Sequence, residues 1–420
     1  MKHRGLLLIF IAAALITFGL SGTALAFHAG GVATCDGCHT MHNSVNGQPV
    51  AGTGPDRTAL TLGSDPSSTC LNCHYDLAAG RSSSYHVMSE DGHYLHAGGD
   101  FFWVQKDYSF IVRGNTVTSY GQDHGHSIVA FDYGLTAQTG AGSVSPGGDY
   151  PVAYLGCTSC HDPHGTVTTR SGAISVSGSY GAVPAADTIA GNYRLLADNG
   201  YRTQNLTYTL PNGPPKAVST NDSVTDDHHT DYGQYMTAFC ANCHGEFANM
   251  PLKHPVGPVN GSLGKTNNTT GQTYAMTYNN YVKTGDFSAG ANGWASPVGT
   301  GPYLELVPFE RNTDTGLAID STDGPNGSSN VMCLTCHRAH ASAFDSAGRW
   351  DFGVEFIAES HPAEGDIDVD DITPGTAPQI TAYYGRDMES LFGEYQRSLC
   401  NKCHANGLLW RNKGYGDLWD

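Results

Sequence analysis

The sequence predicts a chain of mostly irregular coil, with short helices and few strands, wrapped around an interior that its own side chains do not fill. Three observations predict this fold class. Glycine contributes 53 of the 420 residues, and no long apolar run follows the N-terminal segment. Stretches such as SVSPGGD, PNGPP and DGPNGSSN have the composition of turns and loops. All twelve cysteines lie in copies of one short motif. A chain of this composition would bury little apolar surface unaided.

Residues 1–26 are expected to be a secretory signal peptide. The basic start MKHR precedes the apolar run GLLLIFIAAALITFGL, and an A-x-A pattern ends at Ala26. A membrane anchor is the alternative, but the apolar run is short for a span and a cleavage site follows it. We therefore expect residues 27–420 to form a single domain without a membrane span. We expect it to be secreted through the periplasm to the cell outer surface or the extracellular space.

The charge of the exported chain argues against one class of partner. Without Lys2 and Arg4, 19 of the 21 basic residues remain against 39 acidic ones, a formal charge of −20. Nucleic-acid binding requires a basic face. We therefore expect no nucleic-acid partner.

The repeated motif has the form C-x-x-C-H, the attachment signature of c-type haem. Two thiols at this spacing can each bond one vinyl group of a porphyrin, and the histidine that follows can reach the iron. A disulfide framework gives no reason for the histidine, a zinc site needs four convergent ligands, and a thioredoxin-like motif occurs once, near a βαβ pattern. Six covalent haems with their iron are therefore predicted to fill the interior. The motifs are CDGCH (35–39), CLNCH (70–74), CTSCH (157–161), CANCH (240–244), CLTCH (333–337) and CNKCH (400–404).

Each motif supplies two covalent attachment residues and one proximal iron ligand. The predicted attachment residues are Cys35, Cys38, Cys70, Cys73, Cys157, Cys160, Cys240, Cys243, Cys333, Cys336, Cys400 and Cys403. The predicted proximal ligands are His39, His74, His161, His244, His337 and His404.

The opposite face of each iron decides its chemistry, because an open face binds small molecules whereas a filled face permits only electron transfer. Thirteen further histidines follow the signal segment, more than the six that are needed. Histidine is therefore favoured over its rival, methionine, at all six irons, and no catalytic residue is expected. The predicted distal ligands are His42, His86, His126, His164, His254 and His340.

Three of these distal histidines follow a motif histidine at a spacing of three residues: His42 in CHTMH, His164 in CHDPH and His340 in CHRAH. If the attachment segment is helical, both histidines of each pair lie on the same side. The second one then cannot reach the opposite face of the same haem. We expect it to ligate the iron of an adjacent haem and to hold two haems close together.

The remaining histidines are placed by their neighbours in the sequence. His86, His126 and His254 complete the distal set, and His28 is a seventh contender close to the expected new N-terminus. Most members of a last group, in Asp- or Gly-rich surroundings, are expected to be solvated: His93, His96, His124, His228, His229 and His361.

Two segments show a clear secondary-structure pattern. Apolar residues at helical spacing in RDMESLFGEYQRSLCNKCH (386–404) predict a helix before the last motif. FFWVQKDYSFIVRG (101–114) is expected to hold a strand, with turn residues on both sides.

Longer stretches of the chain resemble the six-haem extracellular filament-forming c-type cytochromes, the OmcS-like multihaem cytochrome nanowire family. The resemblance covers nearly all of residues 27–420, and the flanks of the last two motifs make it specific. A departure is the segment 406–420, NGLLWRNKGYGDLWD, an extra C-terminal tail. The matching segments include FHAGGV (27–32), CHTMHNS (38–44), SSYH (83–86), HSIVAFDY (126–133), CHDPHG (160–165), YGQYM (232–236), LKHPVG (252–257), CLTCHRAHASAFDS (333–346), TAYYGR (381–386) and YQRSLCNKCHA (395–405).

The resemblance implies a subunit that polymerises head to tail, with its haems in one continuous stacked chain and two histidines on every iron. It also implies that His42 leaves its own subunit and ligates the fifth haem of the next one, whose proximal ligand is His337. The expected function is extracellular electron transfer by a carrier that is not an enzyme. External metal oxides or other redox proteins are the expected exchange partners.

Two other functions remain open from the sequence. One is a monomeric periplasmic or outer-surface shuttle or metal reductase, which filament imaging would distinguish. The other is a multihaem enzyme that converts nitrogen compounds, which requires an iron with an open face. Against the enzyme, all six motifs end in histidine and distal candidates are in surplus.

Overall fold

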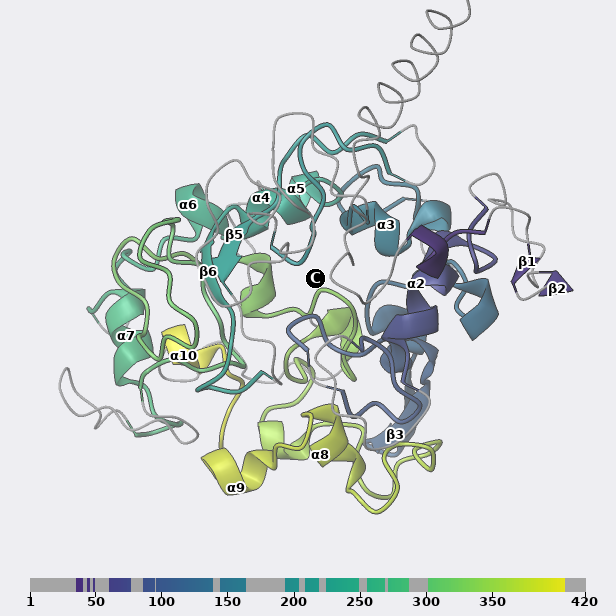
Figure 1. The fold of residues 1–420 in the computed structure, drawn as a ribbon. Helices are drawn as coiled ribbons and strands as arrows, with labels where there is room; N and C mark the ends of the chain where they lie inside the picture. The colour runs from purple at the N-terminus through teal and green to yellow at the C-terminus, as the bar shows by residue number, and fades with distance from the viewer. Residues whose placement is uncertain are drawn as a thin grey trace, which may run out of the picture.

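The fold is built from short elements joined by long irregular segments, as Figure 1 shows for this computed structural model. Among the residues that the structure describes, no helix is both long and apolar enough to cross a membrane. The described residues are 35–40, 44–45, 48–49, 60–76, 86–94, 96–138, 144–163, 193–203, 208–218, 224–248, 255–268, 271–286 and 301–404.

Strands in the described part of the chain form three separate antiparallel pairs. The longest pair, β3 (Tyr108–Val112) and β4 (Asn115–Ser119), is a hairpin. Its two turn residues, Arg113 and Gly114, both have positive φ, which matches the twist of the flanking strands. The other pairs are β1 (Ser44–Val45) with β2 (Gln48–Pro49) and β5 (Lys216–Val218) with β6 (Asp231–Gln234).

The expected strand within 101–114 is confirmed for its second half only. The first half is the 3-10 helix η3 (Phe101–Gln105), which precedes β3. The Asp100 side chain accepts a hydrogen bond from the Phe102 N–H and so caps this helix. The local cap therefore outweighs the β-propensity of the aromatic residues.

The helix expected before the last motif is present but shorter than the apolar spacing predicts. The segment forms α9 (Met388–Phe392) and α10 (Asn401–His404), with turns between them. Gly393 follows α9 with a φ of 90°, a conformation that glycine adopts readily and that ends the helix. The apolar spacing reflects burial of both pieces against the core rather than one long helix.

Short helices hold the attachment motifs. Helix α2 carries the whole second motif, and α10 ends on the histidine of the last one. Figure 1 places α2 beside α3, and α7 beside α10 on the other side of the molecule. Helices at the motifs are η1 (Cys35–Gly37), α2 (Pro66–His74), α3 (Cys157–Cys160), α4 (Met236–Cys240), η9 (Cys333–Thr335) and α10. The other helices are η4 (Gly121–Asp123), η5 (Phe131–Tyr133), η6 (Val152–Tyr154), α5 (Gly245–Ala248), α6 (Gly257–Asn260), α7 (Tyr274–Asn280), η10 (Asp345–Ala347), η11 (Ile357–Glu359) and α8 (Pro378–Ala382).

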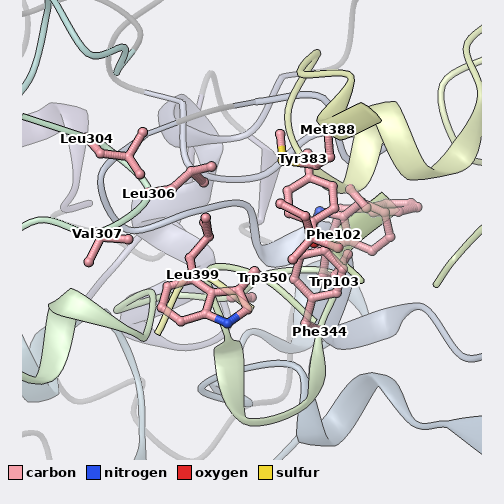
Figure 2. Packing of buried hydrophobic residues seen from close by; sticks show 14 of the residues in the cluster. Phe102, Trp103, Leu304, Leu306, Val307, Phe344, Trp350, Tyr383, Met388 and Leu399 are labelled. Atoms are coloured by element: carbon pink, nitrogen blue, oxygen red, sulfur yellow. The ribbon is translucent and has the colours of Figure 1, made fainter. Parts of the chain in front are cut away.

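Buried apolar side chains also form a hydrophobic core, which is larger than the composition predicts. Figure 2 shows part of the larger cluster, where Trp350 lies near Leu399 and the rings of Phe344 and Tyr383 pack 4.9 Å apart. Residues 301–404 supply much of it. We call their contribution the C-terminal core, whose largest members are Tyr303, Leu304, Leu306, Val307, Phe309, Phe344, Trp350, Ile357, Ile372, Tyr383, Met388, Phe392 and Leu399.

Candidate haem-binding site

Cysteines of successive motifs lie next to one another in space. The thiols of Cys70 and Cys157 are hydrogen-bonded, and so are those of Cys240 and Cys333. The hydrogen bond to Cys157 is the main cause of the raised pKa of Cys70, followed by burial, and the Cys38 thiol also contributes. The first three motifs are therefore neighbours in order, as are the fourth and fifth.

The remaining two steps between motifs also bring thiols within electrostatic range of one another. Burial raises the pKa of Cys243, and the next cause is the thiol of Cys160. Burial is likewise the main cause of the raised pKa of Cys336, and the thiol of Cys400 is the next cause. These sulfur atoms would be thioethers in a haem-bearing protein, so their proximity matters rather than their titration. The six motifs thus follow a single path through the molecule in sequence order.

Three motif histidines have one ring nitrogen fixed by a backbone carbonyl. Nδ1 of His161 lies 2.8 Å from the Arg194 carbonyl oxygen, and Nδ1 of His244 lies 2.7 Å from that of Pro146. Nδ1 of His337 is 2.7 Å from a third carbonyl, that of Ser346. An Nδ1–H that donates to a carbonyl leaves the lone pair on Nε2, which is the arrangement of a metal-binding histidine.

Two motif histidines face a predicted distal histidine at a characteristic distance. The ring centroids of His126 and His244 are 6.0 Å apart, and those of His161 and His340 are 6.3 Å apart. A histidine nitrogen lies about 2 Å from a bound metal ion, so two imidazoles on opposite faces of one ion have centroids about 6 Å apart. By contrast, the stacked rings of Tyr303 and His229 are 3.6 Å apart. We call His126, His161, His244 and His340 the four-histidine cluster.

Backbone hydrogen bonds hold the two distal members of this cluster together. The His126 N–H donates to the His340 carbonyl over 2.8 Å, and Nδ1 of His126 lies 2.6 Å from the Ala339 carbonyl. The His340 N–H in turn donates to the Gly98 carbonyl over 2.7 Å. A Cβ at Gly98 would stand 2.6 Å from Nδ1 of His340, so only glycine leaves room for this ring.

Burial keeps the imidazoles of His126, His161 and His340 neutral. It lowers the pKa of His161 to about 4 and places the pKa of His340 well below its usual value. The pKa of His126 is lowered for the same first reason. A histidine must be neutral to bind iron, because the proton and the metal compete for one lone pair. Two thiols, a neutral anchored imidazole and a second imidazole on the far side are the donor set of a c-type haem with two histidine ligands.

The helical spacing used to place the second histidine of each pair is absent where the structure describes it. Helix α3 ends at Cys160, and His161 has the extended angles φ −109° and ψ 135°. The fifth motif likewise leaves its 3-10 helix before His337. His340 nevertheless faces His161, the histidine of another motif, because the segment after His337 is fixed to Gly98 rather than continued as a helix.

Several predicted site residues lie outside the described part of the chain. They are His42, His164, His254, the contender His28 and the side chain of Cys35. His86 is buried, and its Nδ1 lies 3.7 Å from a carboxylate oxygen of Asp76.

Three of the histidines expected to be solvated, His96, His124 and His229, are buried. Their Asp- and Gly-rich surroundings are themselves inside the molecule, so local composition misled the prediction. His124 uses both ring nitrogens, with Nδ1 2.9 Å from the Trp103 carbonyl and Nε2 2.8 Å from the Ser119 hydroxyl. It is therefore a structural residue.

Two features near the motifs were not anticipated. One is Gly98, whose close approach to the His340 ring cannot be read from the sequence. The other is a buried ion cluster around Glu305 behind the fifth motif. The sequence signal for the cluster was weak, although Arg338 directly follows the motif histidine.

Comparisons of sequence and of structure relate this chain to the same known protein. No family model matches the chain. It is 39% identical to the C-type cytochrome OmcS of Geobacter sulfurreducens over 91% of this chain and 94% of that protein. Two solved structures from this organism resemble it, each over 90% of this chain and all of theirs. OmcS nanowires match with a TM-score of 0.72 at 36% identity, and the outer membrane cytochrome S filament with 0.70 at 35%. The chain belongs to the OmcS family of c-type cytochromes.

Proposed function

We propose that this chain is the secreted subunit of an extracellular filament that carries electrons along six covalently attached haems. The observation that carries the proposal is the succession of attachment cysteines, in which a thiol of each motif lies within electrostatic range of a thiol of the next. Haem supplies one-electron iron chemistry when bound. The polypeptide contributes attachment, axial ligation, spacing and exclusion of water. No substrate-converting residue is needed, and the chain is an electron carrier.

The four-histidine cluster supports specific ligand pairs. We assign His126 as the distal ligand opposite His244, and His340 as the distal ligand opposite His161. His340 lies three residues after His337, so one short segment serves the third and the fifth haems. Rings held by backbone carbonyls cannot turn away easily, and ligands that stay in place keep the reorganisation between the two oxidation states small.

Assembly supplies the remaining contact. The related OmcS structures are of nanowires and filaments. By the same arrangement, His42 of one subunit would ligate the iron proximal to His337 in the next, and the contact would be heterologous and non-closing. One histidine would then join two subunits and two haems. External metal oxides or other redox proteins would accept the electrons at the end.

The test is to compare His42→Ala with the control His228→Ala, whose imidazole is exposed and paired with Asp320. Secreted wild-type protein is expected to form filaments in negative-stain images. His42→Ala should carry six haems by intact mass yet remain monomeric, and His228→Ala should form filaments like the wild type. Normal filaments from His42→Ala would refute the intersubunit ligand. Wild-type protein that stays monomeric would favour the alternative of a soluble shuttle or metal reductase.

A further inference from the structure

A carboxylate in the interior is surrounded by three guanidinium groups. Glu305 lies 3.0 Å from Arg338, 2.8 Å from Arg349 and 3.0 Å from Arg386, measured between side-chain nitrogen and oxygen atoms. Glu305, Arg338 and Arg349 are almost completely buried, and the Arg386 side chain is 13% exposed. We call these four residues the Glu305 cluster.

The Glu305 cluster carries more positive than negative charge. Burial opposes ionisation of Glu305, but the Arg338, Arg386 and Arg349 guanidiniums together hold its pKa below the usual range. A further acid beside the cluster is Asp226, which accepts a hydrogen bond from the Glu305 N–H over 2.6 Å and whose pKa burial raises to about 6. Among the described residues, these three cations therefore pair with Glu305 and lie near one further carboxylate, that of Asp226.

This charge lies directly behind the fifth attachment motif. Arg338 follows His337 in the chain. The Arg349 N–H donates to the Cys336 carbonyl over 2.8 Å, and its Nε donates to the Leu334 carbonyl over 2.6 Å. Arg349 thus holds the loop that carries the motif, and Glu305 holds Arg349.

Buried charge acts strongly on a nearby redox centre. Charges interact more strongly in the protein interior than in water, and salt screens buried pairs much less than exposed ones. Reduction of a haem adds one electron, so a nearby positive charge raises its reduction potential and a negative charge lowers it. Glu305 cancels one of three positive charges that would otherwise act together on the fifth haem.

We propose that Glu305 is a positioning residue that fixes three arginines behind the fifth motif and lowers the reduction potential of the haem attached at Cys333 and Cys336. The inference rests on haem attachment at these cysteines, as in the proposed function. It adds an electrostatic control of one haem among the six. This electrostatic tuning would act on the haem that, by the proposed function, is ligated by His42 of another subunit.

The experiment measures reduction potentials by spectroelectrochemical titration of the haem-loaded protein. Glu305→Gln should shift one of the six components to a more positive potential. Arg386→Gln, which removes a cation but leaves Glu305 paired with two arginines, should shift the same component to a more negative potential. The double variant restores the net charge and should return the component close to its wild-type position. The control Arg397→Gln removes an exposed ion pair with Glu355 and should shift none.

Opposite shifts distinguish tuning from structural damage, because disrupted packing has no reason to reverse sign with charge. Unchanged curves in both single variants, or shifts in the same direction, would overturn the inference. If Glu305→Gln does not fold, a negative shift in Arg386→Gln that the double variant reverses supports the inference. An unchanged potential in Arg386→Gln overturns it. Intact mass and peptide mapping separate the two levels of argument. Loss of haem from Cys333 and Cys336 in the wild type would refute the proposed function, whereas unmoved potentials with all haems present refute only the role of Glu305.

Discussion

Both the four-histidine cluster and the C-terminal core contain buried rings, but the distances between those rings differ. In the cluster, facing rings stand 6.0 and 6.3 Å apart, and carbonyls from distant segments anchor Nδ1 of His126, His161 and His244. In the C-terminal core, rings and aliphatic groups touch directly, and the Phe344 and Tyr383 rings pack 4.9 Å apart. By our proposal, haem iron between the facing rings holds the cluster together, whereas the side chains of the core contact one another directly. Stability and electron transfer should accordingly respond to different mutations.

The largest effect on stability is expected in the C-terminal core. Trp350 is 1% exposed, and its Nε1 donates to the Ser398 hydroxyl over 3.0 Å. Trp350→Ala removes this packing and should lower the free energy of unfolding by about 3–5 kcal/mol. Tyr395→Ala, at a 67% exposed position, is the control and should change it by less than about 0.5 kcal/mol. Equal denaturation midpoints for the two variants would contradict a self-supporting core.

A smaller change in stability with a clear spectroscopic effect is expected at the cluster. In Gly98→Ala, the new Cβ meets the His340 ring, and such overpacking costs about 1–3 kcal/mol. One haem should gain high-spin character because its distal ring is displaced. The control Gly114→Ala lies in open space at a φ of +82° and should cost about 1–2 kcal/mol in backbone strain without a change of spin state. An all-low-spin spectrum for Gly98→Ala would mean that His340 is not a ligand.

A pH-dependent effect is expected at Glu310, whose backbone forms β-bridges with Tyr232 and Asn330. Burial raises the pKa of Glu310 to about 7. Above that pH, the folded protein holds a buried carboxylate at a cost. As pH falls from 7 towards 4.5, the folded state takes up a proton that the unfolded state does not, and stability from this group rises. Glu310→Gln should therefore stabilise the protein by about 1–3 kcal/mol at pH 8 and by little at pH 4.5.

Urea unfolding at the two pH values measures this difference. Glu355→Gln, at a half-exposed position, is the matched control and should change the free energy of unfolding by less than about 0.5 kcal/mol. A Glu310→Gln variant that is less stable than the wild type at pH 8 would show that the ionised carboxylate contributes favourably.

Motif-level features of the site could be predicted from the sequence, because covalent attachment of haem dictates residue types at fixed spacing. The C-x-x-C-H pattern identified candidate proximal histidines, and His161, His244 and His337 have the anchored Nδ1 of a ligand. His126 and His340 were placed among the distal candidates, and both face a motif histidine. Which iron each would serve depends on contacts between segments that are distant in sequence.

Other features were not accessible because they depend on tertiary context. Gly393 interrupts a helix that the apolar spacing favoured, and a single glycine inside such a pattern is often tolerated. His124 was expected to be solvated, yet it is buried and forms hydrogen bonds with Ser119 and Trp103. Glu305 finds its three arginines at positions 33 to 81 residues away, a separation that no local pattern reports.

The most direct test of the central claim compares two histidines that are two residues apart. His126 is assigned to an iron, whereas His124 makes two hydrogen bonds to the protein. In haem-loaded protein, His126→Ala should convert one of six haems to a high-spin, carbon-monoxide-binding form. His124→Ala should keep all six low-spin and lose about 1–3 kcal/mol of stability. If His126→Ala retains six low-spin haems that do not bind carbon monoxide, the claim that paired imidazoles cap the irons of this chain is contradicted.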